Sequence, residues 1–340
     1  MKLGILDQAP VIAGQAPSEA LRASVRLAQA GERMDYGRYW LAEHHGLGGL
    51  ASSTPEVMLG MIGALTSRIR LGAGAILLPY YKPYKVAETF RLLASLYPGR
   101  IDLGVARSPG GPAEMSMALS DNYLERALRM PEDFAELLRY LDGEAPAIPG
   151  AGAAPAAKRA EGPSRGMADD GPAPWVLGTS VKSARLAAAH GTGYAYGHFM
   201  NRDHAQEALA AYRKGFNEAR GGEPRAILAV SAICADTQAK AEEIALGVRA
   251  WRLLAGQGKG EAGIPGTEEA ARLLASEGAA PVRAPGEGHA MAIGDPAQVR
   301  ETLAKWQEEY DADELMIVSY AHDFDDRLRS YELIMEACSR

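Results

Sequence analysis

The run Trp40-Leu41-Ala42-Glu43-His44-His45-Gly46 opens the part of the chain that decides the fold. Its apolar start predicts a buried strand, which ends in one acid and two histidines. Two further runs have the same form, Arg70-Leu71-Gly72-Ala73-Gly74-Ala75-Ile76-Leu77 and Ile101-Asp102-Leu103-Gly104-Val105-Ala106-Arg107. Each is an apolar strand that ends in polar or small residues, with helical segments between them. Parallel α/β barrels place their functional residues at such strand ends.

The alternation of strands and helices continues along the chain. We expect strands at residues 3–7, 39–42, 69–78, 101–107, 175–177, 194–197, 227–234 and 314–319. Apolar residues at helical spacing occupy the intervals between them. Eight such units are typical of a (β/α)8 TIM barrel, although the periodicity alone leaves an open doubly wound sheet as a close alternative.

The helix that follows the first histidine-bearing strand has a clear beginning. Thr54-Pro55 is a capping residue followed by proline, which favours the first helical position. Val57, Met61 and Ala64 are predicted to form its apolar face.

Two stretches interrupt the alternation. Residues 142–174 are rich in Ala, Gly and Pro, and their charges have no helical order; residues 256–290 are rich in glycine around a short helical piece at 268–276. We expect both to be irregular insertions or mobile loops on the surface of one domain that spans residues 1–340, because the series of strands and helices continues without a new core. The second stretch is a possible lid.

The composition is that of an ordinary globular protein, with 47% apolar and 23% charged residues. A net charge of −7 without a basic block argues against nucleic-acid binding. No segment approaches the ~18 apolar residues of a membrane-spanning helix, and no signal peptide is expected. Two cysteines, Cys234 and Cys338, are too few for a disulfide framework, so we expect a cytoplasmic protein.

Several motifs of the chain resemble those of the bacterial-luciferase-like, flavin-dependent monooxygenases. They lie at residues 42–45, 72–79, 83–88, 98–102 and 104–107. Their order and spacing are those of the family, and the resemblance returns near residues 175–200 and 291–320. It implies a closed barrel rather than an open sheet.

The resemblance also implies an activity. Such an enzyme would use reduced FMN and O2 to oxidise a small organic substrate, such as an aldehyde, with incorporation of molecular oxygen from paired donors. A separate flavin reductase would supply the reduced FMN. Relatives on the same barrel leave two alternatives, which are hydride transfer by the deazaflavin F420 and flavin binding without catalysis. Family members pair through helices of the N-terminal half, so we expect a homodimer through residues 55–67 and 83–97. Light emission is not expected, because in luciferases it depends on a second, non-identical subunit.

The acid and histidines at the first strand end are the predicted catalytic region. In the resembled family, the histidine that matches His44 lies beside the reactive edge of the flavin and supports its oxygen chemistry. A neutral imidazole can donate or accept a proton near pH 7. Neighbouring residues of a strand point to opposite sides, so His45 is expected to have a supporting role, and we include Glu43 among the cofactor-binding residues. Alternatively, both rings only cap backbone groups.

The glycines of the next strand do not form a dinucleotide-binding motif. Gly72 and Gly74 lie within a strand, and Leu77 stands where a third glycine would be needed. In the family, the residue that matches Ala75 lies under the flavin ring, beside a non-prolyl cis peptide bond. We therefore expect a cis bond between Gly74 and Ala75, with close packing of strand and helix as the alternative reason for small residues.

Two features predict a phosphate site. Arg107 carries a planar, permanent cation, and the matching arginine of the family contacts the phosphate region of the flavin. Gly178, Thr179 and Ser180 lie between a strand and a helix, where free N–H groups and the helix dipole favour an anion. A surface ion pair of Arg107 and simple helix capping by Thr179 or Ser180 are the alternatives. Ser183, one turn into the helix, is a possible further contact.

The role of His198 and the alternative of a metal-dependent hydrolase are left open by the sequence. His198 follows a predicted strand and is an equally good candidate for the substrate side and for a structural role. A metal hydrolase is a weaker hypothesis, because no HExxH motif is present, and we predict no metal site.

Overall fold

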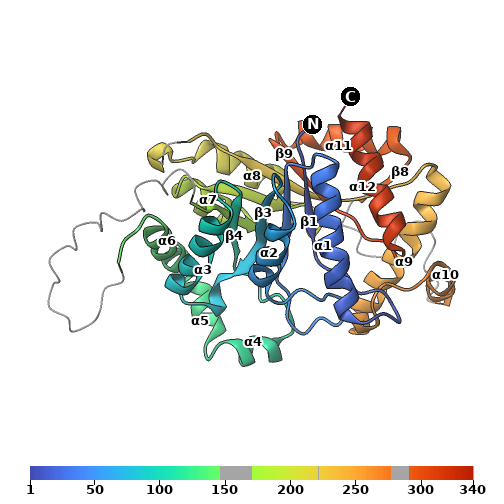
Figure 1. Ribbon diagram of the computed structural model, residues 1–340, viewed down its shortest axis with the longest axis horizontal. Helices are drawn as coiled ribbons and strands as arrows, with labels where there is room; N and C mark the ends of the chain where they lie inside the picture. The colour runs from blue at the N-terminus through green and yellow to red at the C-terminus, as the bar shows by residue number, and fades with distance from the viewer. Residues whose placement is uncertain (146–170, 221, 277–290, 340) are drawn as a thin grey trace.

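The computed structural model describes residues 1–145, 171–220, 222–276 and 291–339 (Figure 1). Its centre is a closed barrel of parallel strands, in the order β1 (Leu3–Asp7), β2 (Arg38–Leu41), β3 (Arg70–Leu77), β4 (Ile101–Ala106), β5 (Ala173–Gly178), β6 (Gly193–Gly197), β7 (Ala226–Cys234) and β9 (Glu314–Val318). Pairing of β1 with β9 and of β6 with β7 closes the ring. The predicted (β/α)8 TIM barrel is confirmed.

One strand outside the ring was not predicted. Strand β8 (Met291–Gly294) pairs only with Ser231–Cys234, the C-terminal part of β7, whose earlier residues pair with β6 and β9. β8 has four residues, two of them buried, so its sequence carries too short an alternation to distinguish it from a loop.

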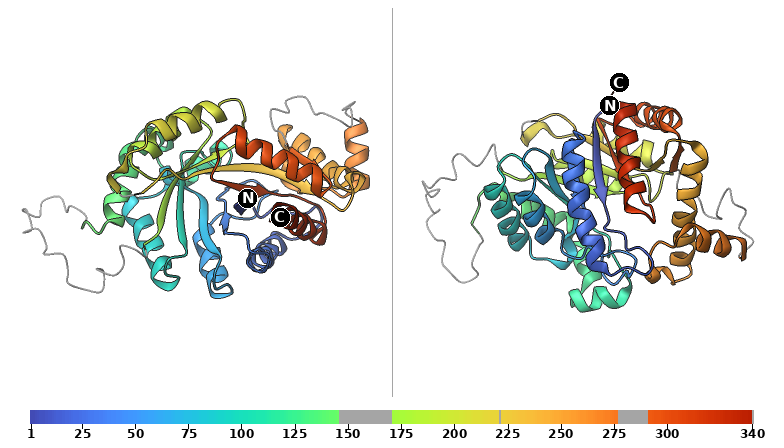
Figure 2. Two further views of the ribbon diagram at one scale, coloured as in Figure 1. Left: turned by 90° about the horizontal axis from the view of Figure 1, so that it is seen from above. Right: turned by 45° about the vertical axis from the view of Figure 1, so that its right-hand side comes forward.

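Helices cover the outside of the barrel. They are α1 (Pro17–Arg33), α2 (Pro55–Ala64), α3 (Pro83–Leu96), α6 (Met130–Leu141), α7 (Val181–Ala189), α8 (Ala205–Lys214), α9 (Gln238–Gly256), α11 (Pro296–Glu309) and α12 (Phe324–Cys338). Helices α1 and α12 lie side by side, and the two chain termini meet at one end of this pair (Figure 2). None of the helices described in the structure is long and apolar enough to cross a membrane.

The prediction for the apolar face of α2 was wrong. Val57 is 67% and Met61 53% exposed, whereas Leu59 and Ile62 are fully buried against the barrel. The helix has apolar residues on both of its faces, so periodicity alone could not show which face turns inward. Its beginning was predicted correctly, because Thr54 is the N-cap and proline occupies the first helical turn.

Two short helices after β4 were also missed. Helices α4 (Ala113–Leu119) and α5 (Tyr123–Leu128) lie together at one end of the barrel (Figure 1). Ser116 is the only buried residue of the two. Without a buried apolar stripe, the sequence has no helical periodicity to read here.

The N-terminal end of the barrel is filled by an ion network. The buried Asp102 carboxylate accepts hydrogen bonds from Arg38 at 2.7 Å, from Arg70 at 2.6 Å and from the Trp40 indole at 2.9 Å. Trp40 meets Trp175 edge to face inside the barrel, with 5.4 Å between the ring centres. This packing fills the lower barrel, so open space is left only towards the C-terminal strand ends.

The predicted insertions fall largely outside the described residues. Residues 146–170 and 277–290 belong to that part of the chain. Within the second stretch, the short helix expected at 268–276 is present as α10 (Thr267–Ser276), and the 3₁₀ turn η4 (Gly260–Ala262) precedes it. Among the described residues, 3₁₀ turns also occur at η1 (Leu78–Tyr80), directly after β3, and at η3 (Glu218–Arg220).

Candidate active site

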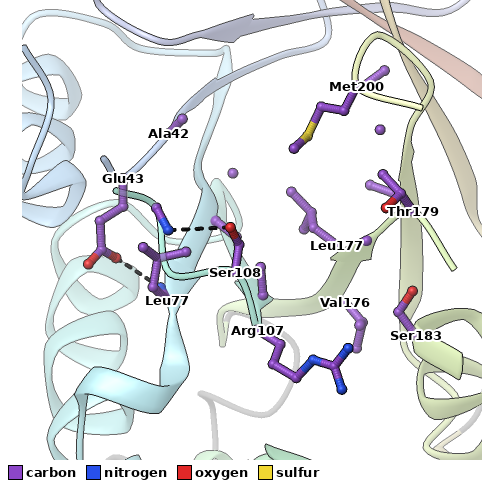
Figure 3. A pocket seen from close by; sticks show the side chains of 18 of the residues that line it. Ala42, Glu43, Leu77, Arg107, Ser108, Val176, Leu177, Thr179, Ser183 and Met200 are labelled. Atoms are coloured by element: carbon purple, nitrogen blue, oxygen red, sulfur yellow. Dashed lines mark hydrogen bonds between the residues drawn. The ribbon is translucent and has the colours of Figure 1, made fainter. Parts of the chain in front are cut away.

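A cavity of about 590 Å³ opens at the C-terminal ends of the barrel strands (Figure 3). All of the predicted site residues line it, namely Glu43, His44, Ala75, Arg107, Gly178, Thr179 and Ser180. These residues come from the ends of β2, β3, β4 and β5, which the barrel order makes neighbours. The size of the cavity is in the range of small-molecule and cofactor sites, which is about 300–1,000 Å³.

His44 lies directly after β2 and is mostly buried in the cavity wall. Its Nδ1 atom has no hydrogen-bond partner among the described residues. Burial, together with the neighbouring His45, lowers the pKa of His44 from 6.5 to about 4. The imidazole is therefore neutral near pH 7, and one ring nitrogen can donate while the other accepts.

Glu43 supports the cavity wall. Its carboxylate accepts hydrogen bonds from the Leu77 N–H at 2.9 Å and the Tyr81 hydroxyl at 2.7 Å, and it lies 2.7 Å from Nε2 of His45. In Figure 3 the carboxylate points towards Leu77, and the residue is only 2% exposed. Glu43 thus links β2 to the end of β3 and orients His45, while direct contact of Glu43 with a cofactor stays a prediction.

The end of β3 has the backbone feature that the resemblance implied. The peptide bond between Gly74 and Ala75 is cis, and both residues line the cavity. A Cβ atom at Gly74 would lie 2.9 Å from Leu6 Cδ1 and 3.1 Å from Trp40 Cε3, so this position has little room for a side chain. The backbone of β3 therefore forms a side-chain-poor wall, against which a flat ring can lie.

The opposite part of the cavity is suited to an anion. Ser180 is the N-cap of α7, and its hydroxyl accepts the Ser183 N–H at 3.3 Å, so the predicted capping role is present. The cap leaves the other N–H groups of this helix end unpaired within the helix. Arg107 lines the same cavity and extends towards Ser183 in Figure 3. Lys182, a second cation of the lining, was missed by the sequence analysis.

A Cβ atom at Gly178 would lie 2.7 Å from the Ser183 Cβ atom, so only glycine fits at the turn between β5 and α7 without displacing its neighbours. The absence of a side chain keeps the backbone open to a ligand. This turn, with the start of α7, has the form that the predicted phosphate site requires, and we call it the phosphate cradle.

Apolar side chains form most of the remaining wall, including Leu177, Phe199 and Met200. The Met200 thioether points into the cavity in Figure 3. Helix α5 contributes Tyr123, whose hydroxyl donates to the Arg107 carbonyl oxygen at 2.6 Å. Gln8, which follows β1, was also missed, although its place at the C-terminal end of a barrel strand was a usable signal.

His198 does not belong to this wall. It is fully buried, and its ring lies 5.0 Å from that of Trp306 and 5.2 Å from that of Tyr310. It is absent from the cavity lining, which favours the structural alternative. The described residues also contain no cluster of three or more His, Cys, Asp or Glu that could bind a metal ion.

Residues 1–312 match the sequence model of the luciferase-like monooxygenases. The chain belongs to this family. Among the relatives of this luciferase-like protein is the uncharacterized protein YwcH of Bacillus subtilis, which is 41% identical over 342 residues and 99% of each chain. A luciferase-like monooxygenase of Escherichia coli is 34% identical over 337 residues, which cover 98% of this chain and 95% of the relative. The N-acetyl-S-alkylcysteine monooxygenase of Bacillus subtilis is 36% identical over 245 residues, which cover 72% and 70% of the two chains.

Solved structures of similar fold include two with bound cofactors. Apo-MsnO8 has a TM-score of 0.84 and 36% identity to this luciferase-like protein, over 99% of this chain and 97% of its own. An FMN complex of the oxygenating constituent of 3,6-diketocamphane monooxygenase from Pseudomonas putida has a TM-score of 0.73 and 18% identity, over 99% and 98%. An F420-dependent secondary alcohol dehydrogenase has a TM-score of 0.64 and 14% identity, over 99% and 98%. The last two share the fold of this chain.

Proposed function

We propose that this protein is a flavin-dependent monooxygenase that uses reduced FMN and O2 to oxidise a small organic substrate. One observation carries the proposal: a single cavity brings together the neutral His44, the flat backbone at Ala75 and an anion site at the start of α7. Membership of the luciferase-like monooxygenase family supports it. One atom of O2 would enter the product, and reduced FMN would be the second donor.

The residues of the cavity fit FMN. The turn at Gly178 has no room for a side chain, and the end of α7 offers N–H groups to the phosphate. Arg107 and Lys182 add positive charge there. The flavin ring would then lie against β3, and His44 lines the same cavity.

When bound, reduced FMN supplies the electrons that activate O2. The chain contributes the surroundings of that chemistry. The apolar wall excludes water, and Glu43 fixes the end of β3 through the Leu77 N–H. The neutral His44 would hold one proton on its ring and donate it in a hydrogen bond beside the flavin, because burial keeps the doubly protonated, charged form unfavourable near pH 7.

The substrate is proposed to be small and mainly apolar, such as an aldehyde or a thioether. The cavity wall around Phe199 and Met200 is apolar, and one relative is named for the oxidation of N-acetyl-S-alkylcysteines. As the family resemblance implies, reduced FMN would come from a separate flavin reductase.

A homodimer is also proposed, through the outer face of α2 and α3. The two helices pack together, with the Tyr97 hydroxyl donating to the Gly60 carbonyl oxygen at 2.7 Å. Their outer face carries exposed apolar side chains, which are Val57 (67%), Met61 (53%), Leu65 (46%), Leu92 (62%) and Leu96 (59%). Such a contiguous apolar face is typical of protein–protein contacts. We further propose a cytoplasmic location, which the free thiols of Cys234 and Cys338 support.

Binding of FMN and of riboflavin, which lacks the phosphate, tests the cofactor proposal. Arg107→Gln should weaken FMN binding by about tenfold and leave riboflavin binding unchanged, because the lost interaction is with the phosphate. Arg185→Gln is the matched control, since Arg185 is exposed on α7 outside the cavity lining. Tighter binding of F420 than of FMN would replace the oxygenase proposal by the hydride-transfer alternative.

The oxygenase step has its own test. The FMN-loaded protein, with a flavin reductase and NADH, is offered decanal or N-acetyl-S-methylcysteine under ¹⁸O2. Incorporation of one ¹⁸O atom into either product supports a monooxygenase. Flavin oxidation without labelled product from either probe, at saturating FMN, would argue for a flavin-binding protein without this activity.

A further inference from the structure

One polar side chain of the cavity has no role in the function proposed above. Gln8 follows β1, is 9% exposed and lines the cavity. In the closed strand order, β1 lies four strands from β5 in either direction, so Gln8 stands across the barrel from the phosphate cradle. In the proposed complex, the phosphate of FMN and Gln8 would therefore lie on opposite walls.

The wall around Gln8 is otherwise apolar. Leu6 of β1, Ala229 of β7 and Met316 of β9 line this side of the cavity. His44 and Ala75 belong to β2 and β3, between this side and the phosphate cradle. A flavin held at the cradle and at His44 would leave the space near β1, β7 and β9 for the substrate.

The orientation of the Gln8 amide follows from its partner. The hydroxyl of Tyr320 donates a hydrogen bond to Gln8 Oε1. Tyr320 is buried, and this burial raises the pKa of its phenol, so the hydroxyl keeps its proton and needs an acceptor. With Oε1 engaged by Tyr320, the Gln8 nitrogen is the group left to donate in the cavity.

The backbone that carries Gln8 is held firmly on both sides. The Asp7 carboxylate accepts hydrogen bonds from Arg327 at 2.8 Å, from the Tyr39 hydroxyl at 2.6 Å and from the Ala9 N–H at 2.9 Å. The Ala9 carbonyl oxygen accepts the Ala51 N–H at 2.9 Å. A donor on such a fixed segment binds an acceptor without a cost of ordering the loop.

We propose that Gln8 is a specificity-determining residue, whose side-chain N–H groups donate to an oxygen acceptor of an otherwise apolar substrate. This inference rests on the proposed function. A carbonyl oxygen fits this role, since it is a strong acceptor that needs no charge on the wall. A substrate of the same shape without the acceptor leaves the buried Gln8 donor unpaired, and the cavity disfavours it for that reason.

A pair of volatile probes of nearly equal shape tests the proposal. 2-Octanone has a carbonyl oxygen where 2-methyl-1-octene has a methylene group. Binding to the FMN-loaded protein is measured by depletion of each probe from the headspace. Gln8→Met keeps the length of the side chain and removes the donor. It should weaken binding of 2-octanone about fivefold to tenfold and change binding of the alkene less than about twofold.

Three further measurements make the outcome decisive. Gln15→Met, on an exposed position of the same loop, should bind both probes like the wild type. Tyr320→Phe retains Gln8 but frees its amide to rotate, and it should lose part of the preference for the ketone. The dissociation constant of FMN should be the same in wild type and Gln8→Met.

The results separate this proposal from the one on which it rests. Equal changes for both probes, or no change, in Gln8→Met and Tyr320→Phe would overturn the role of Gln8. Weaker FMN binding with an unchanged ketone preference would assign Gln8 to the cofactor instead, and would also overturn it. Failure of the wild type to bind FMN would instead refute the proposed function.

Discussion

At the residue scale, the three consecutive residues Glu43, His44 and His45 after β2 differ in their hydrogen bonds and surroundings. The Glu43 carboxylate and Nε2 of His45 are hydrogen-bonded to each other, with 2.7 Å between Oε1 and Nε2. Nδ1 of His44 is buried without a hydrogen-bond partner in the described part of the chain, and the pKa of His44 is lowered to about 4. Both rings follow the end of β2, but only His44 lines the cavity, whereas His45 is hydrogen-bonded to Glu43.

The lowered pKa of His44 predicts a pH dependence of stability. Between pH 6.5 and pH 4, the unfolded chain binds a proton on this residue and the folded chain does not, so stability falls as the pH decreases through this window. At pH 5 the loss relative to pH 7.5 should be on the order of 2 kcal/mol larger in the wild type than in His44→Gln. Urea unfolding at the two pH values measures this difference.

The control for this experiment is His204→Gln, which changes an exposed histidine. It should retain the pH dependence of the wild type. An identical loss of stability in wild type and His44→Gln would show that the burial of His44 does not disfavour its charged form.

At the element scale, the small residues of β3 let other groups approach its backbone. A Cβ atom at Gly72 would lie 2.6 Å from Trp40 Cδ1 and 2.8 Å from the Asp102 Cβ atom. Trp40 is fully buried and donates its indole N–H to Asp102, so it cannot move aside without breaking this bond. The small residues of β3 thus make room for the Trp40 ring at Gly72 and line the cavity at Gly74 and Ala75.

Gly72→Ala should therefore destabilise the protein by about 1–3 kcal/mol, because it overpacks the barrel interior. Gly60→Ala is a matched change in α2, where the new Cβ atom would lie 3.9 Å from Leu93 Cδ2. It should change stability by less than about 1 kcal/mol, in the stabilising direction, because alanine favours helix. Denaturant unfolding compares the two, and equal effects would contradict the crowding at Gly72.

At the scale of the whole molecule, the outer face of α2 and α3 is the surface that the barrel does not cover. The periodicity of α2 placed Met61 on the inward face, and this prediction was wrong; Leu92 of α3 was not predicted to be buried or exposed. In the structure they are 53% and 62% exposed. A second copy of the chain would bury them.

The predicted dimer is tested by light scattering on a gel-filtration column. The wild type should have twice the chain mass of 36.1 kDa. The double variant Met61→Glu and Leu92→Glu should have the mass of one chain, because a dimer would bury four unpaired charges. Leu124→Glu, at a 75% exposed position of α5, is the control and should stay dimeric. A wild-type protein of single-chain mass would refute the dimer.

Much of the architecture could be predicted because it depends on local patterns. The apolar runs that end in His44, Ala75 and Arg107 identified three barrel strands and the end at which their functional residues gather. The resemblance of these motifs to those of the family, in order and spacing, predicted a closed barrel rather than an open sheet. The strand β8 and the helices α4 and α5 escaped prediction, since they are too short or too little buried to leave a periodic signal.

The sequence by itself determined the succession of strands and helices, and with it the set of strand ends that meet in one cavity. Only the tertiary structure decided which face of α2 turns inward, how His44 differs from His45, and that Gln8 stands across the barrel from Gly178. The physical reason is the separation along the chain of the residues that interact. Periodicity reflects contacts within one element, whereas burial and pairing at the cavity depend on ring closure between segments as distant as β1 and β9.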